Sequence, residues 1–131
     1  MKIHMKKLRE IARKHSLRLL VLFGSQAHGT THKESDIDIA FFPGKKVDEE
    51  KLYGDIAAVL KRADIDLVNL FTTHNHMLRY EILSTCALVY EAERGLRSIM
   101  EWQSFFDYTD FKRYYDMRSA LLDKKLKSMA L

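Results

Sequence analysis

The sequence predicts an α/β (α+β) domain, in which helices flank a small mixed sheet and a helical segment extends the carboxyl end. Through the first two thirds of the chain, short apolar runs with the length of buried strands alternate with segments whose apolar residues recur at helical spacing. Such alternation is typical of a sheet covered by helices. From about Arg94 onward the pattern is helical, which predicts the extension.

The individual elements follow from the same patterns. Strands are expected at 18–23, from Asp36 to the Pro43-Gly44 turn, at 64–71 and at 87–90. Amphipathic helices are expected at 2–15 and 48–62, and a third, capped by Asn75, over 76–84. Residues 25–34, between the first two strands, are predicted to form a short helix or turn.

Length and composition limit the classes of protein to consider. The 131 residues suffice for one domain with a single core. No apolar run approaches the roughly 20 residues of a membrane span, and the start lacks the apolar stretch of a signal peptide, so we expect a cytoplasmic protein with no membrane partner. The single cysteine, Cys86, excludes an internal disulfide. A net charge of +4 permits nucleic-acid binding without requiring it, and nucleic acid is not expected as a direct partner.

The stretch from Gly24 to Asp38 carries the clearest chemical signal. The pair Gly24-Ser25 follows an apolar run, and after ten further residues come Asp36 and Asp38, separated by one residue. Residues i and i+2 of a strand share a face, so the two carboxylates are expected side by side, where they repel each other. A hard cation such as Mg²⁺ relieves that repulsion and also takes phosphate oxygens. Because free backbone N–H groups at a strand-to-helix turn favour phosphate, the stretch predicts a nucleotide-handling site.

Each half of this pattern has a more ordinary interpretation when taken alone. A lone Gly-Ser pair is a turn, and a lone Asp-x-Asp is more often surface charge than a metal site. A P-loop is the nearest competitor, since Gly24 and Gly29 have the spacing of its two glycines. Thr30 stands where a P-loop requires lysine, which excludes that interpretation. The combination of both halves at this spacing is what favours the nucleotide site.

The segment resembles the Gly-Ser-x10-Asp-x-Asp signature of the DNA polymerase beta nucleotidyltransferase superfamily. The match is complete at Gly24, Ser25, Asp36 and Asp38. The similarity continues through Asp66 and through LRYEILSTCALVYE at 78–91. The short length resembles the minimal nucleotidyltransferase (MNT) branch, whose members often pair with HEPN-domain toxins. The resemblance implies the nucleotidyltransferase fold, with a core over 1–95 and a C-terminal helical segment over 96–131 that belongs to the same domain and docks the partner.

The resemblance also implies a chemistry, namely transfer of AMP from ATP with the help of two Mg²⁺ ions. Asp36 and Asp38 would hold Mg²⁺ against the phosphates, and Ser25 with the Gly24 turn would hold the terminal phosphates. Asp66 would ligate the second ion and help to deprotonate the acceptor hydroxyl. Asp64 shares its strand face with Asp66, and whether Asp64 also contributes stays open from the sequence.

One departure from the family pattern concerns the phosphates. Many members carry basic residues just after the Gly-Ser pair, whereas this chain has Gln26 and His28. His28 is mostly neutral at neutral pH, so the affinity for triphosphate is expected to be modest. No separate acceptor-binding domain fits in 131 residues, which favours an acceptor supplied by a partner protein.

Two classes of function are therefore compared. In the first, the chain is an antitoxin that neutralises a HEPN ribonuclease toxin, within a hetero-oligomer, by transferring AMP to it. In the second, it masks the toxin by contact alone; transfer to a small-molecule hydroxyl is a further alternative. Half of the aromatic residues lie between Trp102 and Tyr115, more than one covering helix needs to bury, which predicts a partner-binding patch there. The three acidic positions favour the enzyme, because masking requires none of them.

Overall fold

The structure, a computed structural model, describes residues 4–24 and 36–129. Its helices are α1 (Met5–Lys14), α2 (Glu49–Leu60), α3 (His76–Thr85) and α4 (Leu96–Met129). Its strands are β1 (Leu17–Phe23), β2 (Ile37–Pro43), β3 (Ile65–Asn69) and β4 (Ala87–Glu91). The predicted turn at 25–34, with Ser25, Gln26 and His28, lies outside the described residues. The alternation of strands and helices confirms the predicted fold class.

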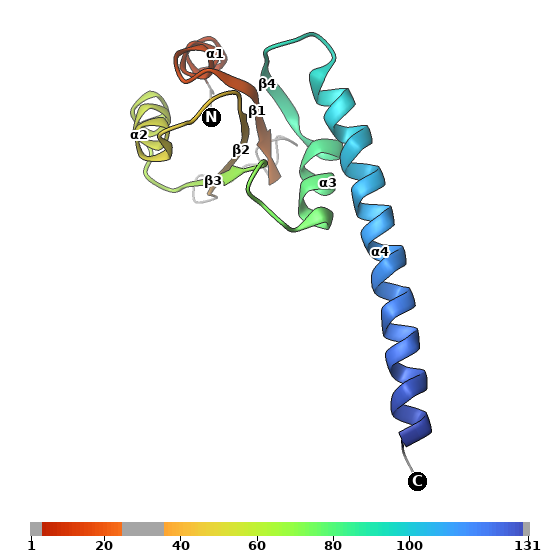
Figure 1. The fold of residues 1–131 in the computed structure, drawn as a ribbon. Helices are drawn as coiled ribbons and strands as arrows, with labels where there is room; N and C mark the ends of the chain where they lie inside the picture. Colours follow the sequence, from red (N-terminus) through yellow and green to blue (C-terminus); the bar gives the residue numbers. More distant parts are fainter. Residues whose placement is uncertain (1–3, 25–35, 130–131) are drawn as a thin grey trace.

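The four strands form one mixed sheet with the order β3-β2-β1-β4 (Figure 1). β1 pairs antiparallel with both β2 and β4, whereas β2 and β3 are parallel. Consequently the end of β1 and the starts of β2 and β3 lie at the same end of the sheet. Among the described residues, those predicted to handle nucleotide, Gly24, Asp36, Asp38 and Asp66, belong to these three strand ends or directly adjoin them.

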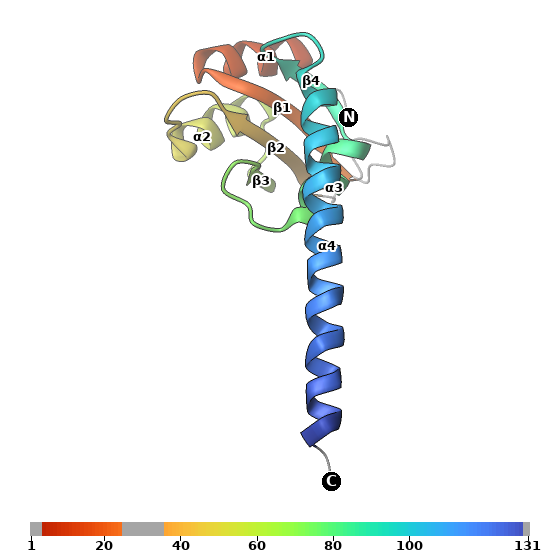
Figure 2. The same ribbon diagram turned by 45° about the vertical axis from the view of Figure 1, so that its right-hand side comes forward.

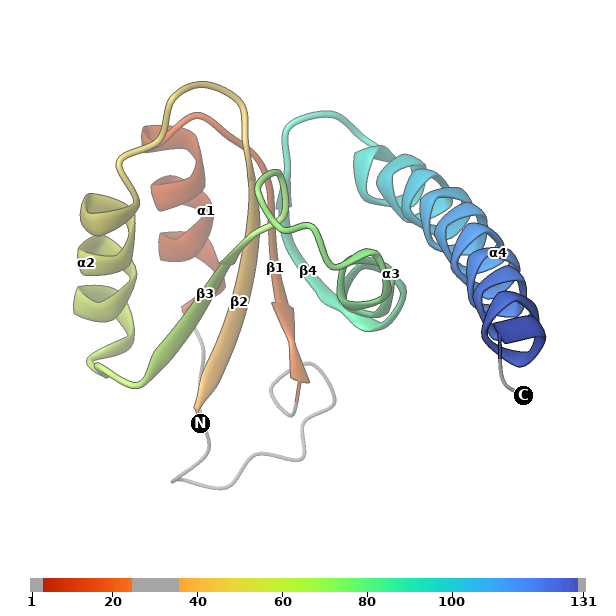
Figure 3. The same ribbon diagram turned by 60° about the horizontal axis from the view of Figure 1, so that its bottom comes forward.

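Helices cover both faces of the sheet, with α1 and α2 on one side and α3 and α4 on the other (Figure 3). The side chains of β1 alternate between two cores, as a strand buried on both faces requires. Leu20 and Leu22 pack in the core beneath α1 and α2, while Leu19 and Val21 pack in the core beneath α3. All four are at least 97% buried, with at most 3% of their surface exposed, so the sheet is a rigid platform for whatever its ends carry.

Local chemistry sets the ends of two helices. The side chain of Asp48 accepts a hydrogen bond from the Lys51 N–H at 3.2 Å and caps α2. Asn75 accepts from the Leu78 N–H at 3.0 Å and caps α3, as its position in the sequence predicts. Lys61 ends α2 in a left-handed conformation with φ of 55°, a backbone geometry that breaks the helix and lets the chain enter β3.

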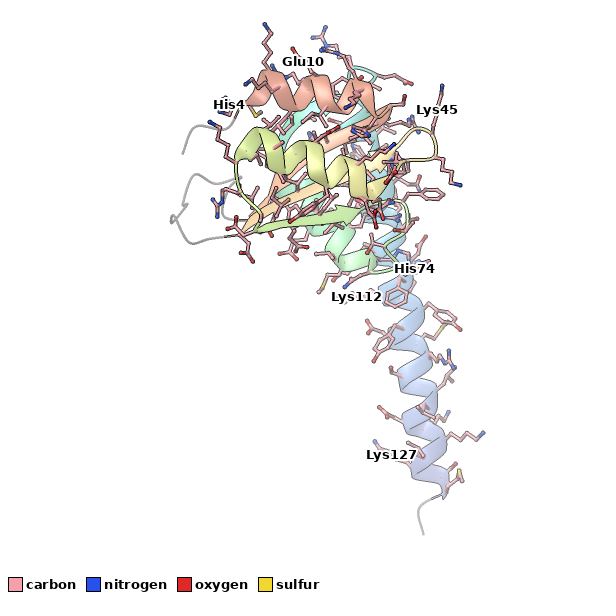
Figure 4. The ribbon with its side chains drawn as sticks, turned by 90° about the vertical axis from the view of Figure 1, so that its left-hand side faces the viewer. His4, Glu10, Lys45, His74, Lys112 and Lys127 are labelled. Carbon is pink, nitrogen blue, oxygen red and sulfur yellow. The ribbon has the colours of Figure 1, made fainter. Side chains whose placement is uncertain are left out.

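The last helix, α4, is a single element of 34 residues whose first part packs against α3 and whose remainder projects past the body (Figures 1 and 2). Ser104 is buried, and Met100 packs against the core beneath α3. The last contact with α3 that involves a ring is Phe111 on His76, with centroids 5.1 Å apart. Figure 4 shows Lys112 close to the body and Lys127 near the far end of the projecting helix. None of the described helices is both long and apolar enough to cross a membrane.

Candidate active site

Asp38 lies on the face of the sheet that α3 and α4 cover. Its neighbours in β2, Ile37 and Ile39, point into the opposite core beneath α1 and α2, whereas Ala40 packs beneath α3. Alternation along the strand therefore turns Asp38 toward the α3 side. Its side chain is half-buried, because it sits at the end of the sheet where the covering helices stop short.

The parallel pairing of β2 and β3 sets Asp38 directly opposite Asp66. Partners in a parallel ladder carry their side chains on the same face of the sheet, so the two carboxylates are neighbours. Asp36 stands one residue before β2 and is exposed. Its negative charge acts on Asp38, as does that of Asp66. The three predicted carboxylates thus gather at one corner of the sheet.

The pKa of the Asp38 carboxyl reflects both its burial and the two neighbouring carboxylates. Burial, followed by the negative charges of Asp66 and Asp36, raises the pKa of the Asp38 carboxyl above its ordinary value. Each of these causes disfavours the ionised form, because it places a charge in a poorer solvent or beside charges of the same sign. A cation at this corner would reverse the effect of both neighbouring carboxylates.

Gly24 forms the wall of this corner on the β1 side. The last residue of β1, Phe23, pairs with Asp38, and Gly24 follows it with a φ of +69°. A Cβ atom at Gly24 would collide with the Oδ2 atom of Asp38. Glycine is therefore required at this position for two reasons. The left-handed backbone disfavours a side chain, and the Asp38 carboxylate occupies the space where a side chain would lie. The prediction that Gly24 makes a tight turn beside the aspartates agrees with this geometry.

The donor set fits a hard divalent cation. Carboxylate oxygens are the protein ligands that Mg²⁺ takes together with phosphate oxygens and water. Burial and then the charges of Asp66 and Asp36 raise the pKa of Asp38, and a cation would offset the part due to the two charges. Within residues 4–24 and 36–129, no three His, Cys, Asp or Glu side chains converge closely enough to enclose an ion by themselves. This is compatible with Mg²⁺, which usually keeps several waters and is held in part by substrate phosphates.

Asp64 differs from Asp66 in its partners. Its carboxylate forms a bidentate ion pair with the Arg62 guanidinium, with Arg62 Nε 2.7 Å from Oδ1 and Nη2 bonded to Oδ2. Arg62 holds the pKa of the Asp64 carboxyl below its ordinary value. Asp64 precedes β3, and its backbone oxygen accepts from the Ile37 N–H at 3.0 Å. A carboxylate committed to a guanidinium is a poorer metal ligand than Asp66, which is exposed in the strand itself.

Arg62 is a residue that the sequence patterns did not single out. Its pKa is raised first by its hydrogen bond to Asp64, and the charges of Asp64 and Asp36 contribute as well. A fixed positive charge therefore lies beside the acidic corner. The only signal in the sequence is its position two residues before Asp64, which gives no indication of where the guanidinium points.

A protein-family model matches more than half of the chain. The model described as "Polymerase beta, Nucleotidyltransferase" matches residues 6–95. The chain belongs to this family. The match covers every described part of the acidic corner, from Gly24 through Asp66, and confirms the family resemblance seen in the sequence. A search of curated proteins gave no match.

Solved structures with the same fold include chains from toxin–antitoxin complexes. One, described as a toxin-antitoxin with AMP-PNP, superposes with a TM-score of 0.73 at 24% identity, covering 94% of this chain and 98% of the other. Another, a complex named MntA-HepT, gives a TM-score of 0.65 at 21% identity over 93% of this chain and 96% of the other. A third, described as a tri-AMPylated Shewanella oneidensis HEPN toxin in complex with MNT antitoxin, gives 0.64 at 21% identity over 93% and 95%. At these identities the likeness shows the fold alone.

Proposed function

We propose that this nucleotidyltransferase is an antitoxin that neutralises a HEPN-type ribonuclease toxin by Mg²⁺-dependent transfer of AMP from ATP to the toxin. The observation that carries the proposal is the register of β2 and β3, which sets Asp38 opposite Asp66 with Asp36 beside them. Support for the acceptor comes from the similar structures, whose descriptions name AMP-PNP and a tri-AMPylated HEPN toxin with its MNT antitoxin.

The three carboxylates have different roles in the proposed reaction. Asp36 and Asp38 would hold Mg²⁺ against the phosphates of ATP, and Asp66 would contribute the third carboxylate on the side of the acceptor. When bound, the metal would supply Lewis-acid stabilisation of the leaving pyrophosphate and make the acceptor hydroxyl more acidic. Asp66 assists removal of the hydroxyl proton. Fixed charges that meet developing charge account for most of the acceleration in this class of reaction.

The triphosphate is bound at the other side of the corner. Gly24 brings the backbone close to Asp38 without a side chain in between, and Ser25, which follows it in the sequence, completes the phosphate-binding turn. Arg62 adds positive charge near Asp36. We assign Arg62 a supporting role, in which it holds Asp64 out of the metal site and offsets part of the negative charge before Mg²⁺ arrives.

The acceptor is brought by the partner, which docks on the C-terminal segment 96–131 and forms a hetero-oligomer with the chain. α4 exposes aromatic and aliphatic side chains that a soluble surface helix ordinarily lacks. Their exposed fractions include 63% for Trp102, 60% for Tyr115 and 55% for Leu122. Docking at these residues would hold the partner's hydroxyl near Asp66 and so supply the positioning that a domain without its own acceptor site needs.

The same exposed surface favours a second candidate function, in which the chain masks the toxin by contact and transfers nothing. Growth rescue separates the two. Cells expressing the toxin receive wild type, Asp36→Asn/Asp38→Asn, or Tyr115→Ala at equal expression. Transfer predicts that both variants fail to rescue, the first through chemistry and the second through docking. Rescue by the aspartate double variant as complete as by wild type would instead establish masking.

A further inference from the structure

A small cavity between α3 and α4, on the aromatic surface of the protein, has a composition that the transfer reaction does not explain. Its volume is ≈ 210 Å³, and it is lined by Tyr80 from α3 and by Glu101, Trp102 and Phe105 from α4. Three aromatic rings and one carboxylate thus surround a space large enough for a side chain. We propose that this cavity, the aromatic cage, binds a cationic side chain of the partner protein.

The rings of the aromatic cage are held in place by further rings. Tyr80 and Phe105 meet at a tilt, with centroids 5.6 Å apart and planes at 59°. Tyr80 is stacked on Tyr108 at 5.9 Å, and Trp102 on Phe106 at 5.8 Å. The outer rings therefore fix the orientation of the inner ones, as a preorganised binding site requires. Trp102 nevertheless keeps 63% and Phe105 38% of its surface exposed, so the cage is open to a ligand.

The electrostatic potential inside the aromatic cage favours a cationic ligand. The face of an aromatic ring carries negative electrostatic potential, and a positive group over Trp or Tyr is attracted to it. Glu101 adds a carboxylate at the wall, and its contact with Arg97 is long, with Glu101 Oε1 3.4 Å from Nη1. That guanidinium nitrogen also donates to the Leu83 carbonyl at 3.0 Å, so Arg97 divides its hydrogen bonds between Glu101 and the backbone of α3.

No cation of the described chain is recorded inside the aromatic cage. The cation–π contacts of the described residues lie elsewhere, with Arg13 over Tyr90 and Arg18 over Phe42. The cage also adjoins apolar surface that a small ion would leave uncovered, since Phe106, which contacts both Trp102 and Phe105, is 51% exposed. A macromolecule that inserts an arginine or lysine would cover both, and its identity as the docked partner rests on the proposed function.

The single tryptophan of the chain makes the test direct, because all indole fluorescence comes from Trp102. N-acetyl-argininamide is titrated into the purified protein at constant ionic strength, with the neutral N-acetyl-glutaminamide as the matched probe. We expect a saturable change in Trp102 emission with the arginine compound only. Glu101→Gln should weaken binding roughly fivefold, whereas Asp107→Asn, which removes a carboxylate of α4 outside the cage, should leave the affinity unchanged.

An equal response to both probes, no response to either, or equal affinity in wild type and Glu101→Gln would overturn the aromatic cage. Because the titration contains neither ATP nor partner, these outcomes leave the transfer reaction untouched. In the complete system, Glu101→Gln should raise KM for the partner roughly fivefold with kcat unchanged, while Asp107→Asn changes neither. A partner KM that does not respond to Glu101→Gln, despite a cage that binds the arginine probe, would contradict the assignment of the cation to the partner.

Discussion

The acidic corner of the sheet and the projecting part of α4 both carry functional proposals, but the chain fixes them to very different degrees. Asp38 is held by two strand ladders, opposite Phe23 on one side and Asp66 on the other. Tyr115, by contrast, lies on a helix that has left the body and is 60% exposed. The fold of the chain itself therefore fixes the geometry of the corner, whereas the exposed surface of α4 would gain further contacts only from another molecule.

Substitutions in the two regions should therefore impair function in different ways. At the corner, like charges are crowded together at a cost to stability, a common property of sites built for catalysis. On projecting α4, apolar side chains are exposed at a cost to solubility. Changes at the corner should affect the chemical step, while changes on α4 should affect association and leave chemistry intact.

The largest effect on AMP transfer is expected from substitution of Asp66, with substitution of Asp64 as the comparison. Asp66→Asn should lower AMP transfer by roughly 10²–10³-fold while ATP binding largely survives, because the lost charge acts on the chemical step. Asp64→Asn is the matched control, two residues away and already paired with Arg62, and should be mild. Transfer is followed with radiolabelled ATP. The reverse ranking would show that the third carboxylate has been assigned to the wrong residue.

On α4, Tyr115→Ala should weaken the complex with the partner by roughly tenfold, the loss typical of a buried interface aromatic, without changing the melting temperature of the free chain. Tyr108→Ala does not separate association from folding, because Tyr108 is half-buried and stacks on Tyr80. It should lower both stability and affinity. Calorimetric binding and thermal unfolding measure the two quantities separately, and an unchanged affinity for Tyr115→Ala would remove projecting α4 from the interface.

Two glycines give a matched test of the corner geometry. Gly24→Ala should destabilise the fold by about 1–2 kcal/mol, because a side chain there meets Asp38 and a left-handed φ. It should also weaken Mg·ATP binding. Gly54→Ala, in α2 with nothing within 4 Å of the added Cβ, should stabilise by about 0.5–1 kcal/mol. Thermal unfolding compares them, and equal effects of the two substitutions would mean that the corner is not tightly packed.

The smallest effect concerns the repulsion at Asp38. Without Mg²⁺, Asp38→Asn should stabilise the fold at neutral pH by up to about 1 kcal/mol, after allowance for solvent screening. Since the pKa of Asp38 is raised in the folded state, its ionised form costs stability above that pKa, and the cost disappears as pH falls through it. The difference between wild type and variant should therefore shrink in acid.

Adding Mg²⁺ provides the control for the same pair of proteins. The ion should raise the melting temperature of wild type and have little effect on Asp38→Asn, because binding to the folded state alone stabilises it. Denaturant titrations at neutral and acid pH, with and without Mg²⁺, give the four comparisons. An identical response of both proteins to Mg²⁺ would indicate that the ion binds elsewhere or not at all.

Most of the fold could be predicted because local patterns determine it. The apolar runs gave the four strands, and Asn75 marked the start of α3. The expected strand at 64–71 is shorter in the structure, where β3 ends at Asn69. The Asn69 side chain accepts from the Phe71 N–H at 2.9 Å, so a local turn replaces the last strand residues. Asp36 and Asp64 likewise stand just before their strands rather than within them.

The sequence could predict which residues belong to the candidate site, but its residue patterns could not predict how those residues pair in space. The spacing of Gly24, Asp36 and Asp38 is local, but the pairing of Asp38 with Asp66 depends on the parallel register, which no short pattern determines. The ion pair of Arg62 and the stacking of Tyr80 on Tyr108 depend on side-chain directions in the folded protein. These tertiary contacts were inaccessible to periodicity and spacing.

If the corner transfers AMP to the protein that docks on α4, that protein must gain the mass of an adenylyl group. The chain is purified together with its co-encoded partner, incubated with ATP and Mg²⁺, and the intact mass of the partner is measured. We expect a partner heavier by whole adenylyl groups with wild type, and an unchanged mass with Asp36→Asn/Asp38→Asn in an intact complex. A partner mass that stays unchanged with wild type, or that rises equally with the double variant, would contradict it.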